Sequence, residues 1–341
     1  MIRALARILG WGAVALAVAA VGVWGTLALH YSDLAPAGLR AALAAGFGFL
    51  TLLTLGSVVA GRRRATVLTI LGAACLALLL YWGTIEPSND RDWAPEVARL
   101  PRATVVGDLV TIHDIRNFDY RTETDFTPAY YDRTFDLRRL DALDLVTAYW
   151  MGPAIAHVFL SFGFGEDHVA VSVEARKERN EGYSSVQGFF KRFELIYVVG
   201  DERDLIRVRT NYRRDPPEDV YLYRVRAPIE NIRRLFLEYV RAINELAERP
   251  RFYDTLTTNC TTTIVLHTRV NPEHAPLSWK VLLSGHAAEY VYERGRLDTS
   301  VPFAELQRRS RINDAARAAD RAPDFSRRIR VGLPGAGAGG S

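Results

Sequence analysis

The sequence contains only two cysteines among 341 residues. Cys75 lies in an apolar run and is expected to be a small membrane-buried side chain, so Cys260 is the single cysteine of the polar part of the chain. Cys260 therefore has no disulfide partner, which excludes a disulfide framework. A lone thiol in an oxidising compartment is a liability and invites a functional explanation, although an inert buried cysteine explains the composition equally well.

Motifs for cofactors and metals are also missing. The sequence has no glycine-rich phosphate loop, no Cys/His spacing suited to a structural zinc ion and no evident internal repeat. We therefore expect no cofactor and no metal.

Acidic residues are nearly absent from the first 84 positions, which carry six arginines and one aspartate. The rest of the chain has 37 basic and 38 acidic residues, so the net charge of +4 originates in the N-terminal region. Binding to nucleic acid would need a basic face on the soluble part. The charge distribution therefore gives no support for a nucleic-acid partner.

Three long apolar runs occupy the same N-terminal region, at 8–29, 39–60 and 65–85. Each is close to the ~20 residues that cross the hydrocarbon core of a bilayer. The first run is longer than the core of a signal peptide and two more runs follow it, so we interpret it as a retained helix. Residues 1–85 are thus predicted to form a three-helix transmembrane region.

The arginines predict the orientation of these helices. Arg3 and Arg7 at the N-terminus and the turn 61–64, with its three arginines, are expected to remain cytoplasmic. The short loop 31–38 then lies outside, and the third helix exits outward. This arrangement delivers everything after about Glu86 to the periplasm of a bacterial inner-membrane protein.

The polar part of the chain is predicted to comprise a linker at 86–106, a periplasmic catalytic-like domain at 107–323 and a disordered tail at 324–341. Two alternating apolar runs, 154–162 and 168–175, flank a glycine-containing turn and predict a β-hairpin. Other expected strands are 108–115, 145–150, 195–199, 205–209 and 220–225. Helices are expected from Pro228 to about Leu246 and from near Asn259 through His267.

Cys260 falls at the predicted start of the second of these helices. Thr and Asn residues just before an apolar helical run are typical of a helix N-terminus, so Asn259 is a supporting residue. Unpaired backbone N–H groups and the positive end of the helix dipole would stabilise a thiolate there, and could hold the oxyanion of a tetrahedral intermediate. Position and isolation together favour a nucleophile over a core cysteine.

A cysteine nucleophile needs a base, and His157 is the strongest candidate because it interrupts an otherwise apolar strand. A satisfied core histidine is the simpler explanation of the same residue. The hairpin register is expected to bring His157 opposite Ser172 or Glu174, and Glu174 would then orient the imidazole as the third member of a triad. His168, near the turn, is the alternative base.

Two clusters of charged residues, at 174–181 and 207–214, could bind a phosphate headgroup or a carboxylate. They are at least as well explained as solvated ends of strands.

Four segments together resemble the Lnb N-terminal periplasmic domain family. They begin at Arg116 (RNFDYRTE), His157 (HVFLSFGF) and Ser172 (SVEAR), and the fourth runs from Tyr253 to the NCTT around Cys260. The similarity spans roughly 112–298. It implies a papain-like, permuted NlpC/P60-type α+β fold with an antiparallel sheet, in which the histidine precedes the cysteine. Arg176 and Tyr253, within these segments, are expected to bind substrate.

The resemblance also implies a function, because the family is named for a bacterial lipoprotein N-acyltransferase. Cys260 would be acylated by a phospholipid and would pass the acyl chain to an amine such as a lipoprotein N-terminus. A thiol peptidase, amidase or lipid hydrolase with the same Cys–His dyad is the first alternative. A non-catalytic binding domain is the second, and deep burial of a thiol with a pKa near ~8.5 would favour it.

Overall fold

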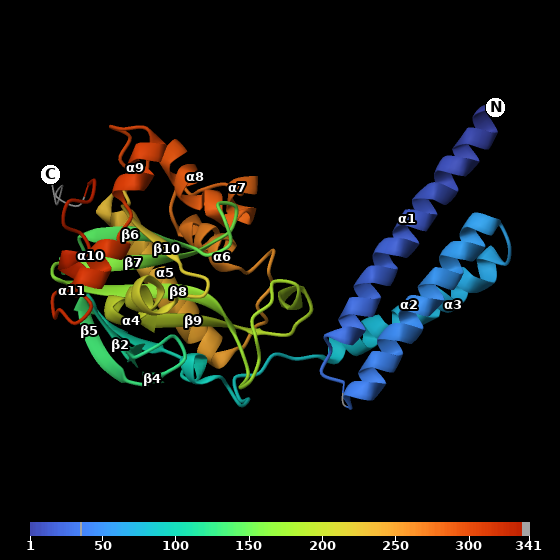
Figure 1. Cartoon of the computed structure of the whole chain (residues 1–341), viewed down its shortest axis with the longest axis horizontal. Helices are drawn as coiled ribbons and strands as arrows, with labels where there is room; N and C mark the ends of the chain where they lie inside the picture. The colour runs from blue at the N-terminus through green and yellow to red at the C-terminus, as the bar shows by residue number, and fades with distance from the viewer. Residues whose placement is uncertain (35, 336–341) are drawn as a thin grey trace. The chain divides into compact units, whose positions relative to one another are not determined.

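The computed structural model of the chain describes residues 1–34 and 36–335. These residues divide into two units (Figure 1). The helix unit comprises residues 1–88 together with 184–193, and the sheet unit comprises residues 89–183 and those from 194 onward.

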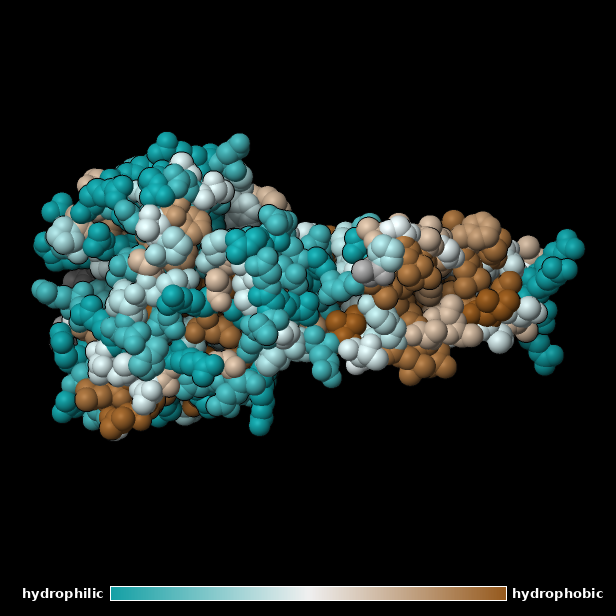
Figure 2. Space-filling model, turned by 90° about the horizontal axis from the view of Figure 1, so that it is seen from below, coloured by the Kyte–Doolittle hydropathy of each residue, from teal (hydrophilic) through white to brown (hydrophobic). Residues whose placement is uncertain are grey.

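The helix unit contains α1 (Ile2–His30), α2 (Ala37–Ala60) and α3 (Arg64–Thr84), and all three are long and apolar enough to span a membrane. The shortest has 21 residues, which corresponds to about 31 Å at the rise of an α-helix. Leu52 and Leu80 remain exposed by more than half, and Figure 2 shows apolar side chains over the surface of this unit. The three predicted apolar helices are confirmed, and each is long and apolar enough to span a membrane.

The contact between α1 and α2 depends on glycine. A Cβ atom added to Gly22 would overlap the side chain of Thr51, and one added to Gly25 would overlap the ring of Phe47. Small residues allow helix backbones to approach closely where no hydrophobic effect drives helices together. The glycines therefore determine how closely these two helices pack.

Residues 184–193 belong to the helix unit although they connect two strands of the sheet unit. The ring of Phe190 packs against Tyr31, with the ring centroids 5.5 Å apart. The Lys191 ammonium donates to the backbone oxygens of Trp82 (2.9 Å) and Ile85 (3.2 Å), and Arg192 forms an ion pair with Asp33. The segment therefore closes one end of the three-helix group.

The sheet unit is built on one eight-stranded sheet with the order β1-β2-β9-β8-β7-β6-β10 and with β5 also paired to β2. All pairings are antiparallel except β2 with β9, which is parallel at Arg116 and Gly200. The fold is therefore α+β, as expected, but the sheet is mixed rather than antiparallel. The strands are β1 (Arg102–Val106), β2 (Leu109–Arg116), β5 (Tyr130–Asp136), β6 (Ala142–Tyr149), β7 (Ala156–Phe164), β8 (Asp167–Arg176), β9 (Glu194–Gly200) and β10 (Asp219–Arg224), with β3 (Asp119–Tyr120) and β4 (Phe126–Thr127) forming a separate pair.

Helices cover both faces of this sheet (Figure 1). On one face Phe162 of β7 packs against Phe236 and Tyr239 of α5, with centroids 5.0 and 6.0 Å apart. On the other face Phe159 belongs to a buried apolar cluster with Phe325. The helices of this unit are α4 (Glu202–Arg207), α5 (Ile229–Glu248), α6 (Cys260–His267), α7 (Trp279–Leu282), α8 (Ala287–Glu293), α9 (Phe303–Arg309), α10 (Asn313–Ala318) and α11 (Phe325–Arg328).

Most of the predicted local elements are present. The hairpin is β7 and β8, with Gly165 at φ +73° in its turn, where glycine adopts the left-handed conformation without strain. The strands expected at 195–199 and 220–225 are β9 and β10, and the two expected helices are α5 and α6. The strand predicted at 205–209 is wrong, because the segment forms α4 and a π-helical turn at Val208–Tyr212. Asp201 caps this helix by accepting from the Arg203 N–H at 2.8 Å, and short apolar runs do not distinguish strand from helix.

The predicted limits of the domain need correction at both ends. The expected linker at 86–106 includes β1, which pairs with β2. The expected disordered tail at 324–341 includes α11 and its C-cap Ile329, and Phe325 and Ile329 are at most 1% exposed. Residues 336–341 lie outside the described residues. The first part of the tail is therefore integral to the fold.

We expect Arg330→Ala to lower the free energy of unfolding by about 3–5 kcal/mol, because it would remove a cation shared by two buried carboxylates. Asp144 would keep its pair with Arg224, whereas Glu202 would keep, among the described residues, only the hydrogen bond from Ser161. Arg330 is 8% exposed and donates to Asp144 (2.8 Å) and Glu202 (2.5 Å), neither of which is exposed. The thermal unfolding midpoint of the detergent-purified chain measures the effect. Arg328→Ala, which removes an exposed pair with Asp324, is the matched control and should cost no more than ~1 kcal/mol. Equal midpoints for the two variants would contradict this role for Arg330.

Candidate functional site

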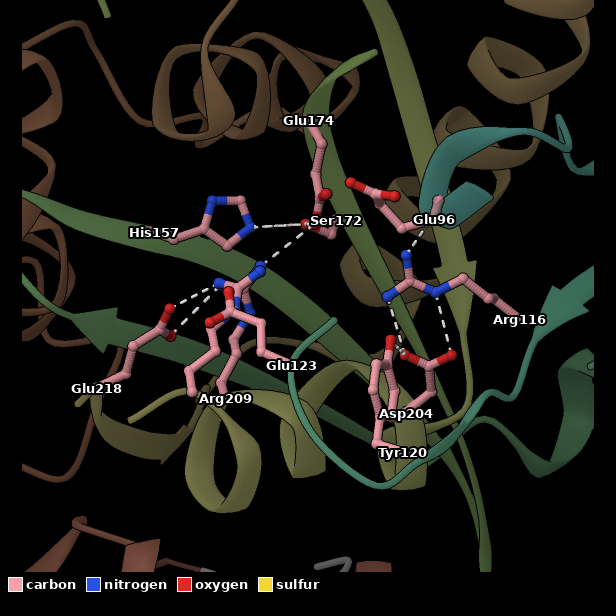
Figure 3. Close-up of polar contacts among 11 residues, drawn as sticks. Glu96, Arg116, Tyr120, Glu123, His157, Ser172, Glu174, Asp204, Arg209 and Glu218 are labelled. Atoms are coloured by element: carbon pink, nitrogen blue, oxygen red, sulfur yellow. Dashed lines mark hydrogen bonds and ion pairs between the residues drawn. The ribbon is translucent and has the colours of Figure 1, made fainter. Parts of the chain in front are cut away.

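The candidate site lies where β7 and β8 separate. The two strands are paired from Phe164–Asp167 to Leu160–Val171, and both continue beyond this ladder. In the continuing part the His157 Nε2 atom lies 2.7 Å from the Ser172 hydroxyl oxygen. Ser172 donates to the Glu174 carboxylate at 2.8 Å, and His157 Nε2 itself is 3.7 Å from that carboxylate (Figure 3).

This chain of contacts assigns the tautomer of His157. The Ser172 hydroxyl has one proton, which it donates to Glu174, so its oxygen accepts from the imidazole. The Nε2 atom of His157 therefore carries the proton, and Nδ1 keeps a lone pair. In this arrangement a serine lies between the histidine and the acid, and Nδ1 is the nitrogen that can act as a base.

Arg209 completes the buried network and was not among the residues predicted from the sequence. Its guanidinium is 5% exposed and donates to Glu174 at 3.3 Å and to Glu218 at 3.4 Å, while Arg213 binds Glu218 at 2.6 Å (Figure 3). Arg209 lies in the π-helical turn after α4, and such turns are frequent at functional sites. The sequence feature that could have indicated Arg209 is the charged cluster at 207–214. A solvated end of a strand explained that cluster at least as well.

The charges of this network have opposite effects on the two titratable residues. Burial alone would raise the pKa of Glu174, but Arg209, His157 and the Ser172 hydroxyl stabilise the carboxylate and lower its pKa to about 2. Burial and the charge of Arg209 lower the pKa of His157 to about 3, against the opposing effect of Glu174. At neutral pH the network therefore holds a carboxylate and a neutral imidazole.

Cys260 is the first residue of α6, as expected. The Asn259 side chain caps the helix by accepting from the backbone N–H of Thr262 at 2.8 Å, so the predicted supporting role of Asn259 is that of an N-cap. The Cys260 side chain accepts hydrogen bonds from the backbone N–H groups of Val158, Thr261 and Cys260 itself. The sulfur thus touches the strand residue that directly follows His157.

Burial raises the pKa of the Cys260 thiol, and it outweighs both these N–H groups and the nearby charge of Arg209, which lower it. The residue is nevertheless partly exposed. At neutral pH the sulfur is therefore a thiol rather than a thiolate.

The structure brings Cys260 and His157 to the same end of β7 from different sides. His157 shares a face of the strand with Phe159, its ring 5.7 Å away, whereas α6 packs with α5 on the other face. Within residues 1–34 and 36–335 no hydrogen bond joins the Cys260 and His157 side chains. They approach each other through Val158, at the point where β7 no longer pairs with β8.

The other predicted site residues have different positions. His168 lies at the closed end of the hairpin, opposite Gly163, with Nδ1 3.3 Å from the Glu166 backbone oxygen. Arg176 is 2% exposed and donates to the backbone oxygens of Val97 and Ala98 at 3.0 and 2.8 Å, so it is a structural residue and we do not retain it as substrate-binding.

Tyr253 lies close to Cys260, and the pKa of its hydroxyl is raised by burial, by Tyr183 and by the charge of a Cys260 thiolate. Its oxygen is 3.4 Å from that of Tyr183, which is about half exposed. Tyr253 is therefore the predicted substrate-binding residue that the structure brings near the sulfur.

A second buried group beside the network is structural. Arg116 donates twice to Asp204, at 3.0 and 2.8 Å, and Tyr120 donates to the same carboxylate at 3.1 Å (Figure 3). Asp204 also accepts from the Phe118 backbone N–H at 2.8 Å. Since Asp204 is fully buried and occupied by four donors, this group anchors the segment after β2 rather than offering a free site.

The fold and the site define an α+β domain that carries a cysteine at a helix N-terminus and a buried His–Ser–Glu–Arg network, in a chain with three helices able to span a membrane. Residues 126–285 match the Lnb N-terminal periplasmic domain family. The family predicted from the sequence is thus confirmed. No curated protein and no solved structure matches the chain.

Proposed function

We propose that the chain is a membrane-anchored thiol acyltransferase whose sheet unit acts in the periplasm. Cys260 would take an acyl chain from a phospholipid and transfer it to an amine such as a lipoprotein N-terminus. The observation that carries the proposal is the network of His157, Ser172, Glu174 and Arg209, which is buried next to the strand residue that binds the Cys260 sulfur. A buried network of this kind at a partly exposed thiol is typical of an activated nucleophile.

In the first half-reaction the Cys260 sulfur attacks the ester carbonyl of the phospholipid while Nδ1 of His157 takes the thiol proton. The backbone N–H groups of Val158 and Thr261, which bond the sulfur at rest, would turn to the developing oxyanion. The ester C–O bond then breaks, the alkoxide of the lysophospholipid takes the proton from the imidazolium, and a thioester remains on Cys260. Glu174 stabilises the imidazolium through Ser172.

In the second half-reaction the amine attacks the thioester. His157 accepts the proton that the amine loses and returns it to the departing sulfur, so the amide forms and the thiol is restored. The pKa values imply that the resting enzyme is a neutral thiol–imidazole pair, in which deprotonation accompanies attack.

The finer fold and the orientation are part of this proposal. A cysteine at the N-terminus of a helix that packs on a sheet, with the histidine earlier in the chain on a strand, supports a papain-like, NlpC/P60-type arrangement. The arginines at the N-terminus and at 62–64 support a cytoplasmic N-terminus in a bacterial inner membrane.

One observation favours a different class of function. The raised pKa of the buried Cys260 thiol is the property expected of an inert cysteine, and it supports a non-catalytic binding domain. A hydrolase differs from the transferase only in using water as the acceptor.

Intact mass of the detergent-purified chain after incubation with bacterial phospholipid tests the proposal, with Cys260→Ser as the comparison. We expect a hydroxylamine-labile acyl adduct on the wild type alone, and its transfer to an added lipopeptide amine. Hydrolysis of the adduct by water, without transfer to the amine, would show that the chain is a hydrolase. No adduct, with Cys260 also unreactive to iodoacetamide, would show the binding domain; no adduct with a reactive Cys260 would point to a peptide-cleaving enzyme.

The pH dependence of Cys260 alkylation follows from the shifted pKa values. His157 is neutral at all pH values well above 3, so we expect the rate with iodoacetamide to follow only the ionisation of the thiol, without a step near pH 6.5. Arg209→Gln removes a charge that lowers the pKa of His157, so this pKa should rise. The step in alkylation rate that marks protonation of His157 should then appear at a higher pH than in the wild type. Arg179→Gln, at an exposed arginine, should keep the wild-type profile. A step near pH 6.5 in the wild type would contradict the neutral imidazole.

A further inference from the structure

An apolar cavity of about 140 Å³ lies beside α6 in the sheet unit. Leucines of β6 and β7 form one wall, and α5 and α6 form another. The side chains that make these walls apolar include Leu143, Leu145, Leu160, Ile232, Leu235 and Ile264. Its size is comparable with that of apolar cavities of ~150 Å³ that take up a benzene-sized molecule.

Two elements lead from the Cys260 sulfur to this cavity. Ile264 of α6 and Thr268, the C-cap of this helix, line the cavity. They follow Cys260 by four and eight residues, so the three lie on one side of the helix. Along β7, Val158 binds the sulfur through its N–H group, and Leu160, two residues on and on the same face, lines the cavity. Four helical residues, from Cys260 to Ile264, rise by about 6 Å. Two strand residues, from Val158 to Leu160, span a similar length.

The charged side chains among the lining residues do not make the cavity a polar site. Arg296 and Glu273, which both line it, form an ion pair with each other at 2.5 Å. The guanidinium of Arg294 lies 5.9 Å from the ring centroid of Tyr290. Of the uncharged polar lining residues, Thr268 and Asn271 donate to backbone oxygens at 2.7 and 3.1 Å. Aliphatic side chains of β6, β7, α5 and α6 make up much of the remaining lining.

We propose that this cavity binds the proximal part of the acyl chain that is esterified to Cys260. The inference rests on the proposed function, which places an acyl chain on the sulfur, and adds where that chain lies. A benzene-sized volume whose nearest lining residue on α6 is one helical turn from Cys260 accommodates a segment of about six carbons, and the rest of a long chain extends beyond it. The cavity therefore selects chains long enough to reach it.

Ala227 and Ala275 line the cavity and are partly exposed, so a larger side chain at either position fills it without disturbing the buried core. Ala227→Phe is the test variant and Ala275→Trp is a second one in case the first does not fold. Ala129→Phe is the matched control, because Ala129 lines a different hollow of the sheet unit.

The first measurement is binding of a fluorescent polyene fatty acid to the detergent-purified chain, in a Cys260→Ala background that prevents reaction. We expect hexadecanoic acid to displace the probe. Ala227→Phe should weaken binding by at least about tenfold, since each buried methylene contributes about fourfold to affinity, whereas Ala129→Phe should not change it. Equal binding by Ala227→Phe and Ala129→Phe, with Ala275→Trp also unchanged, would overturn the assignment of the cavity.

The second measurement is acylation of Cys260 by phospholipids with two butanoyl or two hexadecanoyl chains. A butanoyl chain is too short to enter the cavity, so Ala227→Phe should keep its rate within about twofold while hexadecanoyl transfer falls at least about tenfold. An equal effect on both donors would overturn the proposal. If the wild type forms no adduct with either donor, the proposed acyl transfer fails, and the binding measurement alone decides whether the cavity holds an acyl chain.

Discussion

Cys260→Ala should lose acyl transfer completely, a fall of about 10⁴-fold or more, while the protein remains folded. The sulfur is the only protein atom that bonds to the acyl group in the proposed reaction. The substitution removes one atom from a helix that Asn259 still caps, so we expect a loss of stability of at most ~1 kcal/mol.

Transfer of a radiolabelled acyl chain to a lipopeptide measures the activity, and thermal unfolding of the same preparation measures the fold. Cys75→Ala, in α3, is the matched control and should keep full activity. Wild-type activity in Cys260→Ala would eliminate the nucleophile and with it the proposed function. Lost activity together with a much lower unfolding midpoint would instead indicate a structural cysteine.

His157→Ala should slow acyl transfer by about 10²–10⁴-fold, the usual contribution of a general base. Because burial keeps the Cys260 thiol protonated at neutral pH, the sulfur depends on a base at the moment of attack. The substitution also removes the hydrogen bond to Ser172 but leaves the ion pair of Glu174 with Arg209, so the network keeps its charge balance.

The rate of Cys260 alkylation by iodoacetamide at pH 7 is the direct measurement, since it needs no substrate. We expect His157→Ala to be slower than the wild type and His168→Ala to be unchanged, because His168 lies at the other end of the hairpin. An unchanged rate in His157→Ala would remove this residue as the base. A slow rate in His168→Ala alone would transfer the role to that histidine.

The elements that the sequence predicted are those whose pattern is local. Three runs of about 20 apolar residues have few alternatives to a membrane span. The β7–β8 hairpin follows from two alternating runs and a glycine turn, and α6 follows from the Asn259 cap. The meeting of His157 with Ser172 was also predictable, because the register of a short hairpin follows from its turn.

The errors fall where partners are distant in the sequence. Arg176 looked like a substrate-binding residue, but it is covered by backbone oxygens of Val97 and Ala98, about 80 residues earlier. Arg330 looked like part of a disordered tail, but its charge is matched by Asp144 and Glu202. Nothing within a few residues of either arginine indicates these partners.

The sequence by itself determined the three long apolar helices, the hairpin, the capped helix with its cysteine and the family resemblance, because each depends on motifs whose residues lie close together in the chain. Only the tertiary structure decided that Arg209 joins the network of His157 and Glu174, that β2 pairs with β9 in parallel, and that an apolar cavity adjoins the helix of Cys260. These depend on which distant side chains are buried together, and the free energy of that burial is a property of the whole packed unit.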